Sequence, residues 1–381
     1  MKINLILIVL IFALVPNNKG IAQLSGSIGY SWFFEDNPQR IPTGKSEYVN
    51  SVKSDLSLRI FDKEIYLNYS GNFNAFSIIN DRTFQMHSLG LNYAFNTTND
   101  DEENIFSGIN YSMKKGTGEY SAYDFGQTSG FINGKFQINE TFFLKPAYST
   151  SYKIFPALNN LVHYENLISS QLSKFFETRT GIFLEAGIGS MNYSFKNEAL
   201  LPVNGSASGK RYGKQSSNNT LSFNVVQFRT MLKISQSLFE NTGINVHYLY
   251  RKNLKDNKGV FQSADYIYSG DDELWDDPYG YSSNEIGAEL TQKILYDITL
   301  KLNAEFSNRH YTNNLSDTLN LAQRIDERFG LWGGISKTFE ELPIIDNLEL
   351  SLEYLLINNS SNSAIFTYKN NMLLFGFQIG F

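Results

Sequence analysis

The chain has no cysteine, few charged residues for its length and only one long apolar run. Without cysteine, no disulfide framework can hold the fold together. Charged residues make up 18% of the 381 residues, below the share of about a quarter that is usual for soluble domains. The net charge of -6 and the absence of a concentrated basic patch give no sign of nucleic-acid binding. There are no repeats of about 20–50 residues, no heptads and no proline-rich linker, so the sequence predicts one domain.

The single long apolar run lies at the N-terminus. Lys2 precedes Leu5–Val15, and the small-x-small stretch Gly20-Ile21-Ala22 follows before Gln23. This order is typical of a cleaved secretory signal peptide. The run is shorter than the roughly 20 residues that a membrane-spanning helix needs, so a transmembrane anchor is the weaker interpretation. We expect a signal peptide over residues 1–22 and a mature domain over residues 23–381.

Beyond residue 22, no apolar stretch is long enough to cross a bilayer as a helix. The mature chain is therefore either soluble or crosses a membrane with strands, whose apolar residues are spread out by alternation. Aromatic residues make up 15% of the chain, with 23 Tyr and 30 Phe. Tyr and Phe line the two interfacial girdles of membrane β-barrels, so the composition favours the second alternative.

Alternation of apolar and polar residues runs along the whole mature chain. In the segment 65–75 the odd positions are apolar or small, whereas the even positions carry Tyr66, Asn68 and other polar residues. In the segment 298–307 the even positions are apolar and the odd positions are polar. Successive side chains of a strand point to opposite faces, so each segment has one apolar and one wet face. A helix would mix both kinds of residue on every face.

This alternation predicts an all-β fold, a transmembrane antiparallel up-and-down β-barrel of about 16 strands, with roughly 14–18 possible. The expected strand cores are residues 23–33, 47–60, 64–76, 82–95, 104–114, 122–137, 140–154, 161–175, 180–195, 219–237, 242–252, 281–294, 298–310, 321–338, 346–358 and 367–381. A soluble β-sandwich in the periplasm is the alternative fold.

The connections between these strands alternate in length. The odd-numbered ones are mostly long and polar, as at 34–46, 196–218, 253–280 and 311–320, and the even-numbered ones are mostly short. Outer-membrane barrels carry long loops on the outer rim and short turns on the periplasmic rim. A three-residue turn at Leu295–Asp297 also keeps the polar residues of both flanking strands on one face, which a two-residue turn would not do.

The C-terminal segment Met372–Phe381 places Leu373, Phe375, Phe377, Ile379 and Phe381 on one face. A final amphipathic strand that ends in Phe resembles the C-terminal signal read by the bacterial barrel-assembly machinery. Over nearly the whole mature chain, the architecture resembles that of porin-like outer-membrane β-barrel proteins of Gram-negative bacteria, although no motif points to one family. The resemblance implies an outer-membrane location and contact with outer-membrane lipid and lipopolysaccharide.

Charged side chains on the predicted polar faces are expected to line the lumen of this barrel. They are Lys53, Asp55, Arg59, Arg229, Lys233, Glu289, Lys293, Lys301, Glu305, Glu349 and Glu353. Such residues either hydrate and cross-link the barrel wall or tune solute selectivity, and we favour the first role for any single residue. Because both signs are present, the sequence predicts no strong ion preference. The expected function is passive or weakly selective passage of small solutes; a non-conducting structural or assembly barrel is the alternative.

Two loop features have a surface interpretation. Gly270–Asp277 clusters five carboxylates around Trp275, but its spacing does not match an EF-hand, so we expect a solvated acidic loop rather than a cation site. The run Asp100–Glu103 is similar and falls on the periplasmic rim. Basic residues in or beside the outer loops are expected to serve solubility, with contact to lipid phosphates or anionic solutes as the alternative: Lys210, Arg211, Lys214, Arg251, Lys252, Lys255 and Lys258.

The four histidines, His87, His163, His247 and His310, stand alone in the sequence. None has the local spacing of a metal site, and there is no Gly-x-Ser-x-Gly elbow and no phosphate-binding motif. We therefore predict no enzymatic activity, no cofactor and no bound metal. A barrel enzyme of the lipase or protease type stays open as an alternative, because catalytic groups that lie on different strands are recognised by geometry rather than by sequence order.

Overall fold

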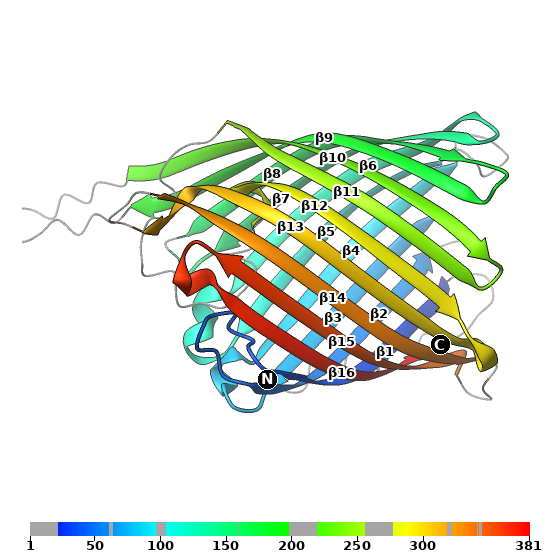
Figure 1. Ribbon diagram of the computed structural model, residues 1–381, viewed down its shortest axis with the longest axis horizontal. Helices are drawn as coiled ribbons and strands as arrows, with labels where there is room; N and C mark the ends of the chain where they lie inside the picture. Colours follow the sequence, from blue (N-terminus) through cyan, green and yellow to red (C-terminus); the bar gives the residue numbers. More distant parts are fainter. Residues whose placement is uncertain are drawn as a thin grey trace, which may run out of the picture.

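A computed structural model describes residues 22–60, 64–96, 104–158, 160–197, 219–255, 277–317, 322–340, 342 and 345–381. Its strands form one closed barrel in which each strand pairs with its sequence neighbours and β1 pairs with β16 (Figure 1). The strands are β1 (Ala22–Glu35), β2 (Glu47–Ile60), β3 (Ile65–Phe76), β4 (Phe84–Asn96), β5 (Asn104–Gly116), β6 (Phe125–Asn139), β7 (Phe142–Phe155), β8 (Leu161–Phe175), β9 (Thr180–Asn197), β10 (Asn219–Phe239), β11 (Thr242–Lys255), β12 (Tyr281–Lys293), β13 (Ile298–Asp317), β14 (Ala322–Glu340), β15 (Asn347–Ser361) and β16 (Tyr368–Gly380).

The predicted fold class and the count of sixteen strands are confirmed. The largest difference lies between β13 and β14, where a loop was expected over residues 311–320 but β13 continues to Asp317. The alternating pattern does not show where β13 ends, because a strand that extends beyond the apolar layer has water on its outer face as well. Polar residues then fit both faces, and the period-2 signal ends before the strand does.

Short 3-10 helices occur in several connections. The odd-numbered connections carry η1 (Asn80–Arg82), η2 (Gly118–Tyr123), η4 (Pro278–Gly280) and η6 (Ala364–Phe366). These connections gather at the left end of the barrel in Figure 1, whereas short turns join the strands at the right end. One of those turns is η5 (Leu295–Asp297), with Tyr296 and Asp297 in the left-handed region at φ 62° and 57°. It brings Lys293 opposite Thr299, which keeps the polar faces of β12 and β13 together.

One face of the sheet is apolar and exposed over its whole circumference. Large side chains on this outer face include Leu89, Ile109, Ile168, Ile188, Ile286 and Leu352, each more than 45% exposed. Facing water, a continuous apolar surface of this size would drive aggregation, whereas lipid is its natural solvent. The structure is a single closed sheet with an apolar exterior, so the alternative fold, a soluble β-sandwich, is wrong.

The few charges on the outer face lie toward the ends of the strands. Lys174 lies with its Nζ 5.0 Å from the ring centre of Phe176, and Lys337 has its Nζ 4.7 Å from the ring centre of Phe339. Lysines beside aromatic rings at a membrane boundary hold their alkyl chains in the apolar layer and their ammonium groups in the polar one. The short-turn end of the apolar band is therefore marked by two Lys–Phe pairs.

Within the described ranges, no helix is both long and apolar enough to cross a membrane. The predicted signal peptide of residues 1–22 lies almost wholly outside the described residues. So do the acidic runs 100–103 and 270–276, and the basic residues Lys210, Arg211, Lys214 and Lys258. Their expected roles stay predictions.

Adjacent residues on β8 allow a direct test of which face meets lipid. Ile168 is 66% exposed on the outer face, and Ser169 points to the inner face beside Gly187. We expect Ile168→Arg to lower the free energy of unfolding in lipid bilayers by about 2–4 kcal/mol, the cost of a cation near the bilayer midplane. Ser169→Arg should cost less than about 1 kcal/mol, because its side chain reaches water. Denaturant titration in liposomes measures both; equal costs would contradict the assignment of faces.

Candidate functional site

The inner face of the barrel carries the charged residues that the sequence singled out. Strand register places all eleven on the face opposite the exposed apolar side chains: Lys53, Asp55, Arg59, Arg229, Lys233, Glu289, Lys293, Lys301, Glu305, Glu349 and Glu353. Their orientation follows from the two-residue period of each strand, as expected. Whether they act on a passing solute is not decided by their position and stays a prediction.

Several of these residues lie together. Lys53, Lys301, Glu349 and Glu353 line one recess of about 360 Å³, although they come from β2, β13 and β15. Trp332 on β14 donates from Nε1 to Glu353 at 3.0 Å within the same recess. The recess therefore combines two cations, two anions and an indole N–H, a mixed set that offers hydrogen bonds to solutes of either sign.

Four of the candidates, Lys53 of the recess among them, form ion pairs along the wall. Lys53 Nζ lies 3.0 Å from Asp55, Arg59 lies 3.2 Å from Glu64, and Arg229 lies 3.1 Å from Glu185. These side chains are between a quarter and three fifths exposed, so each pair contributes little to stability, about 0–1 kcal/mol. Their main effect is to keep opposite charges interleaved around the lumen.

The wall formed by β3 to β6 differs from the rest, because few charged residues face inward from it. A recess of about 730 Å³ beside it is lined mainly by small neutral side chains, among them Ser27, Ser57, Asn68, Ser88 and Asn110. The wall formed by β8 to β14 instead carries most of the inward-facing charges. The lumen thus has a hydroxyl- and amide-lined side facing a charged side.

A short chain segment folds into the barrel from the outer rim. This inner segment, Asp277–Tyr281, contains η4 and leads directly into β12. Tyr279 is only 5% exposed, and its hydroxyl donates to Glu165 Oε1 at 2.8 Å. Glu165 is on β8, four strands from β12 in the barrel order, so the tyrosine reaches across part of the lumen.

Side chains of β10 and β11 hold the inner segment by hydrogen bonds to its backbone. Gln227 Nε2 donates to the carbonyl of Pro278 at 2.6 Å and to that of Tyr281 at 3.1 Å, while Asn253 Nδ2 donates to the carbonyl of Tyr279 at 3.0 Å. Gly189 lies under the Tyr279 ring, where a Cβ would come within 2.2 Å of the hydroxyl oxygen. The wall is therefore shaped to receive this tyrosine.

Asp277 is the first residue of the inner segment, and its carboxyl group has a raised pKa. Its Oδ1 accepts from the backbone N–H of Tyr279 at 2.9 Å, and its other oxygen accepts from the Tyr193 hydroxyl on β9. Burial, with a further contribution from the charge of Glu165, raises the pKa of the Asp277 carboxyl from 3.8 to about 6. Burial and the nearby Glu165 also raise the pKa of Tyr279, which stays a neutral donor.

Sequence reasoning missed this arrangement, although a local signal was present. Asp277-Pro278 is a helix-start signal, with an acceptor at the N-cap and proline at the first helical position. That signal indicates a turn, but nothing in it tells that the turn points inward. The expectation of a solvated acidic loop over residues 270–277 does not hold at Asp277, which is half-buried and accepts hydrogen bonds from Tyr279 and Tyr193; the residues before it lie outside the described chain.

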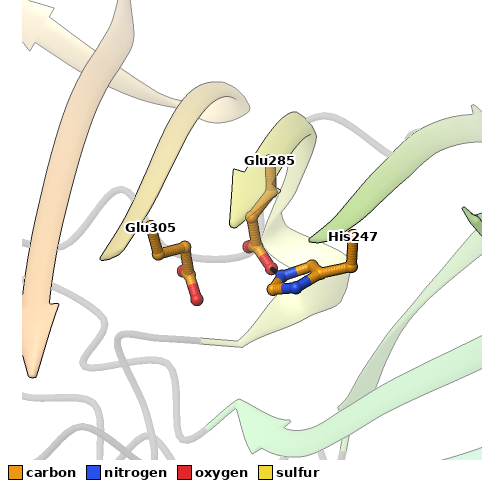
Figure 2. A group of neighbouring side chains, drawn as sticks. All are labelled: His247, Glu285 and Glu305. Carbon is orange, nitrogen blue, oxygen red and sulfur yellow. Dashed lines mark ion pairs between the residues drawn. The ribbon is translucent and has the colours of Figure 1, made fainter. Parts of the chain in front are cut away.

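The histidines occupy different environments. His163 is packed between the rings of Phe155 and Tyr193 on the inner face, and His87 faces outward with the Tyr69 hydroxyl 2.8 Å from its Nδ1. His247 is different, because Glu285 and Glu305 on the next two strands bring their carboxylates to the same point of the lumen (Figure 2). Local spacing misses this group because its members are brought together only by cross-strand pairing.

Comparison with known proteins gives matches of fold alone. No family model and no curated protein matches the chain. Among solved structures, Acinetobacter baumannii OccAB3 superposes with a TM-score of 0.50 and 6% sequence identity, covering 94% of this chain and 99% of that one. Pseudomonas aeruginosa OccK8 (OprE) gives 0.49 and 8%, over 95% and 100% of the two chains. OmpT, an outer membrane protein of Vibrio cholerae, gives 0.46 and 12%, over 96% and 99%.

The chain therefore has the fold of an outer-membrane β-barrel. The prediction that it is not an enzyme is wrong as an exclusion. Its structural matches are barrels that include OmpT beside the Occ proteins, and a shared barrel does not determine whether its interior is catalytic. That prediction rested in part on the four histidines standing alone in the sequence, and this does not hold for His247, which lies beside Glu285 and Glu305.

The inner segment should be held more firmly at acidic pH. Because the pKa of Asp277 is raised when the segment is docked, docking loses stability as the pH rises from about 4 to about 6, and the loss is complete above that range. Hydrogen exchange of the Tyr279 amide, corrected for its intrinsic pH dependence, should show protection falling over this window. Asp277→Asn should remove the dependence. The Ile286 amide within β12 is the internal reference; identical profiles for both amides would contradict the assignment.

Proposed function

We propose that the chain is a porin-like channel that passes small hydrophilic solutes passively or with weak selectivity across the outer membrane of a Gram-negative bacterium. The observation that carries the proposal is the inner face, on which hydroxyl, amide and charged groups of both signs line recesses of about 360 and 730 Å³ inside a closed sixteen-strand wall. Barrels of about this strand number are wide enough to leave an aqueous passage. The Ser- and Asn-lined side suits neutral polar solutes, and the interleaved charges disfavour a strong ion preference.

The two ends of the chain carry the features that would bring it to the outer membrane. A signal peptide over residues 1–22 would direct export, and the assembly machinery would read β16, whose outward side chains include Phe375, Phe377 and Ile379, followed by the terminal Phe381. Outer-membrane lipid and lipopolysaccharide are the proposed surroundings of the apolar band. Lys252, near the end of β11, lies on the outer face close to the outer rim, where lipid phosphates are one source of counter-charge, whereas Arg251 faces the lumen beside Glu285.

A second candidate function rests on the inner segment. Asp277–Tyr281 takes up lumen space and is held by side chains of β8, β9, β10 and β11. If the lumen around this segment were filled completely, the barrel would not conduct and would have a structural or assembly role at the surface. Conductance separates the two functions.

The experiment is single-channel recording of the refolded protein in planar bilayers. A porin-like channel should give stepwise, ohmic conductance that a purified unfolded sample does not give. Tyr279→Phe removes the hydrogen bond to Glu165 without changing the ring, so it should increase fluctuations between conductance levels. A protein that inserts as a folded barrel yet passes no current would support the non-conducting alternative.

Charge reversal in the recess tests whether solutes pass the predicted lumen residues. We expect Lys53→Glu combined with Lys301→Glu to shift permeability toward cations on the order of two- to fivefold, because a charge a few ångström from the path is worth about 1 kcal/mol in water. Increasing the salt concentration should reduce this shift. Reversal of Lys174, which lies on the outer face, is the matched control; an equal shift there would contradict passage through the recess.

A further inference from the structure

Three potential metal ligands from neighbouring strands meet on the charged side of the lumen. His247 is on β11, Glu285 on β12 and Glu305 on β13, and their ligand atoms all lie within 4.8 Å of one another. His247 Nε2 lies 4.0 Å from Glu285 Oε1. Figure 2 shows the imidazole beside the Glu285 carboxylate, with the Glu305 carboxylate directed toward the same space.

The backbone under the cluster is shaped for the histidine. Gly287 pairs with His247 on one side and with Glu305 on the other, so it lies between the two ligands at the same level of the barrel. A Cβ at Gly287 would come within 2.3 Å of His247 Cε1 and 2.7 Å of Nε2. The absence of a side chain therefore lets the imidazole lie across β12 and point its Nε2 toward the glutamates.

The carboxylate of Glu285 is oriented by a second contact. The residue is only 9% exposed, and its Oε2 lies 3.6 Å from Arg251 Nη1 while Oε1 faces His247. The charged groups that act on Glu285 are Glu305, Arg251, Arg309 and His247. One carboxylate oxygen is thus engaged by an arginine and the other is directed into the cluster, an arrangement that fixes metal-binding carboxylates in known sites.

We infer that His247, Glu285 and Glu305 bind a divalent first-row transition metal, for which Zn²⁺ is the probe. An imidazole nitrogen with two carboxylate oxygens is a ligand set that suits this class of ion. Bonds of about 2.0–2.2 Å place tetrahedral ligand atoms about 3.4 Å apart, so the present spacing closes by roughly 1 Å through rotation of the glutamate side chains. Three protein ligands leave at least one position open toward the lumen.

The inference rests on the barrel fold and on no assumption about solute passage. A cation between Glu285 and Glu305 offsets the repulsion of two carboxylates in a partly buried position and adds to the effect of Arg251 and Arg309. Metal binding needs a neutral imidazole and ionised carboxylates, so the affinity for the metal should fall as the solution is made more acidic.

The test is Zn²⁺ binding to the folded barrel in detergent, measured by competition with a chromophoric chelator after metal removal. We expect one site per chain that is weakened at least tenfold in His247→Gln and in Glu305→Gln, consistent with loss of one of three ligands. Gly287→Ala should weaken it as well, because the new Cβ displaces the ring without removing a ligand. Binding of Co²⁺ should give a visible absorption band in the wild type that is lost in His247→Gln and in Glu305→Gln.

Matched controls separate this site from adventitious binding. Glu289 lies on the same face of β12, two inward positions beyond Glu285, and His163 is the other inward histidine, so Glu289→Gln and His163→Gln should both bind Zn²⁺ as the wild type does. Migration of unboiled samples on SDS gels shows that each variant is folded. Equal binding in the wild type and in His247→Gln would overturn the inference, as would binding that is lost only when Asp271, Asp272 and Glu273 are neutralised.

Discussion

The structure depends on one constraint: every backbone N–H and C=O group that crosses the apolar layer must find its partner within the sheet. In lipid no water is available to satisfy an open edge, so a spanning sheet has to close on itself. Closure is made by β1 and β16, which pair from Ser27 opposite Gly380 to Glu35 opposite Met372. The last strand of the chain therefore completes the first, and the amphipathic character of every other strand follows from a wall with lipid on one side and water on the other.

Closure also explains which parts of the structure were predictable from the sequence. The period-2 pattern is a local property, so it identified nearly all strand positions, the face of each lumen residue and the three-residue turn before Ile298. It failed where strands leave the apolar layer, as at the end of β13, because water on both faces removes the pattern.

The interior clusters were not predictable in this way. Tyr279 meets Glu165, and His247 meets Glu305, only through the combined register of several strands, and a shift of one residue in any pairing would separate them. Their local signals, a proline-containing helix start at 278 and a glycine at 287, become informative only once their neighbours across the sheet are known. Sequence reasoning therefore gave the wall of the barrel and the orientation of its residues, but not the groups that those residues form with one another.

The interior combines two kinds of wall with two side-chain arrangements, one around Tyr279 and one around His247. A hydroxyl- and amide-lined side faces a charged side, and the charged side holds both the inner segment Asp277–Tyr281 and the His247 cluster. In both arrangements an aromatic ring packs on a glycine: Tyr279 on Gly189 and His247 on Gly287. A Cβ at either glycine would collide with the ring. Glycine in a strand weakens the sheet, so its use under these two rings indicates that the close approach is required.

The most direct test of the account is a disulfide across the closing seam. The protein has no cysteine, and a Cβ at Gly376 would lie 3.6 Å from the Cβ of Ser31, within the range that a disulfide needs. Ser31→Cys with Gly376→Cys should form a disulfide on mild oxidation of membrane-inserted protein, seen as loss of free thiols and faster migration after boiling. Ser31→Cys with Ser351→Cys spans two strand spacings, about 9–10 Å, and should stay reduced. Free thiols at both positions of the first pair in folded protein would show that β1 and β16 are not neighbours and would contradict the closed barrel.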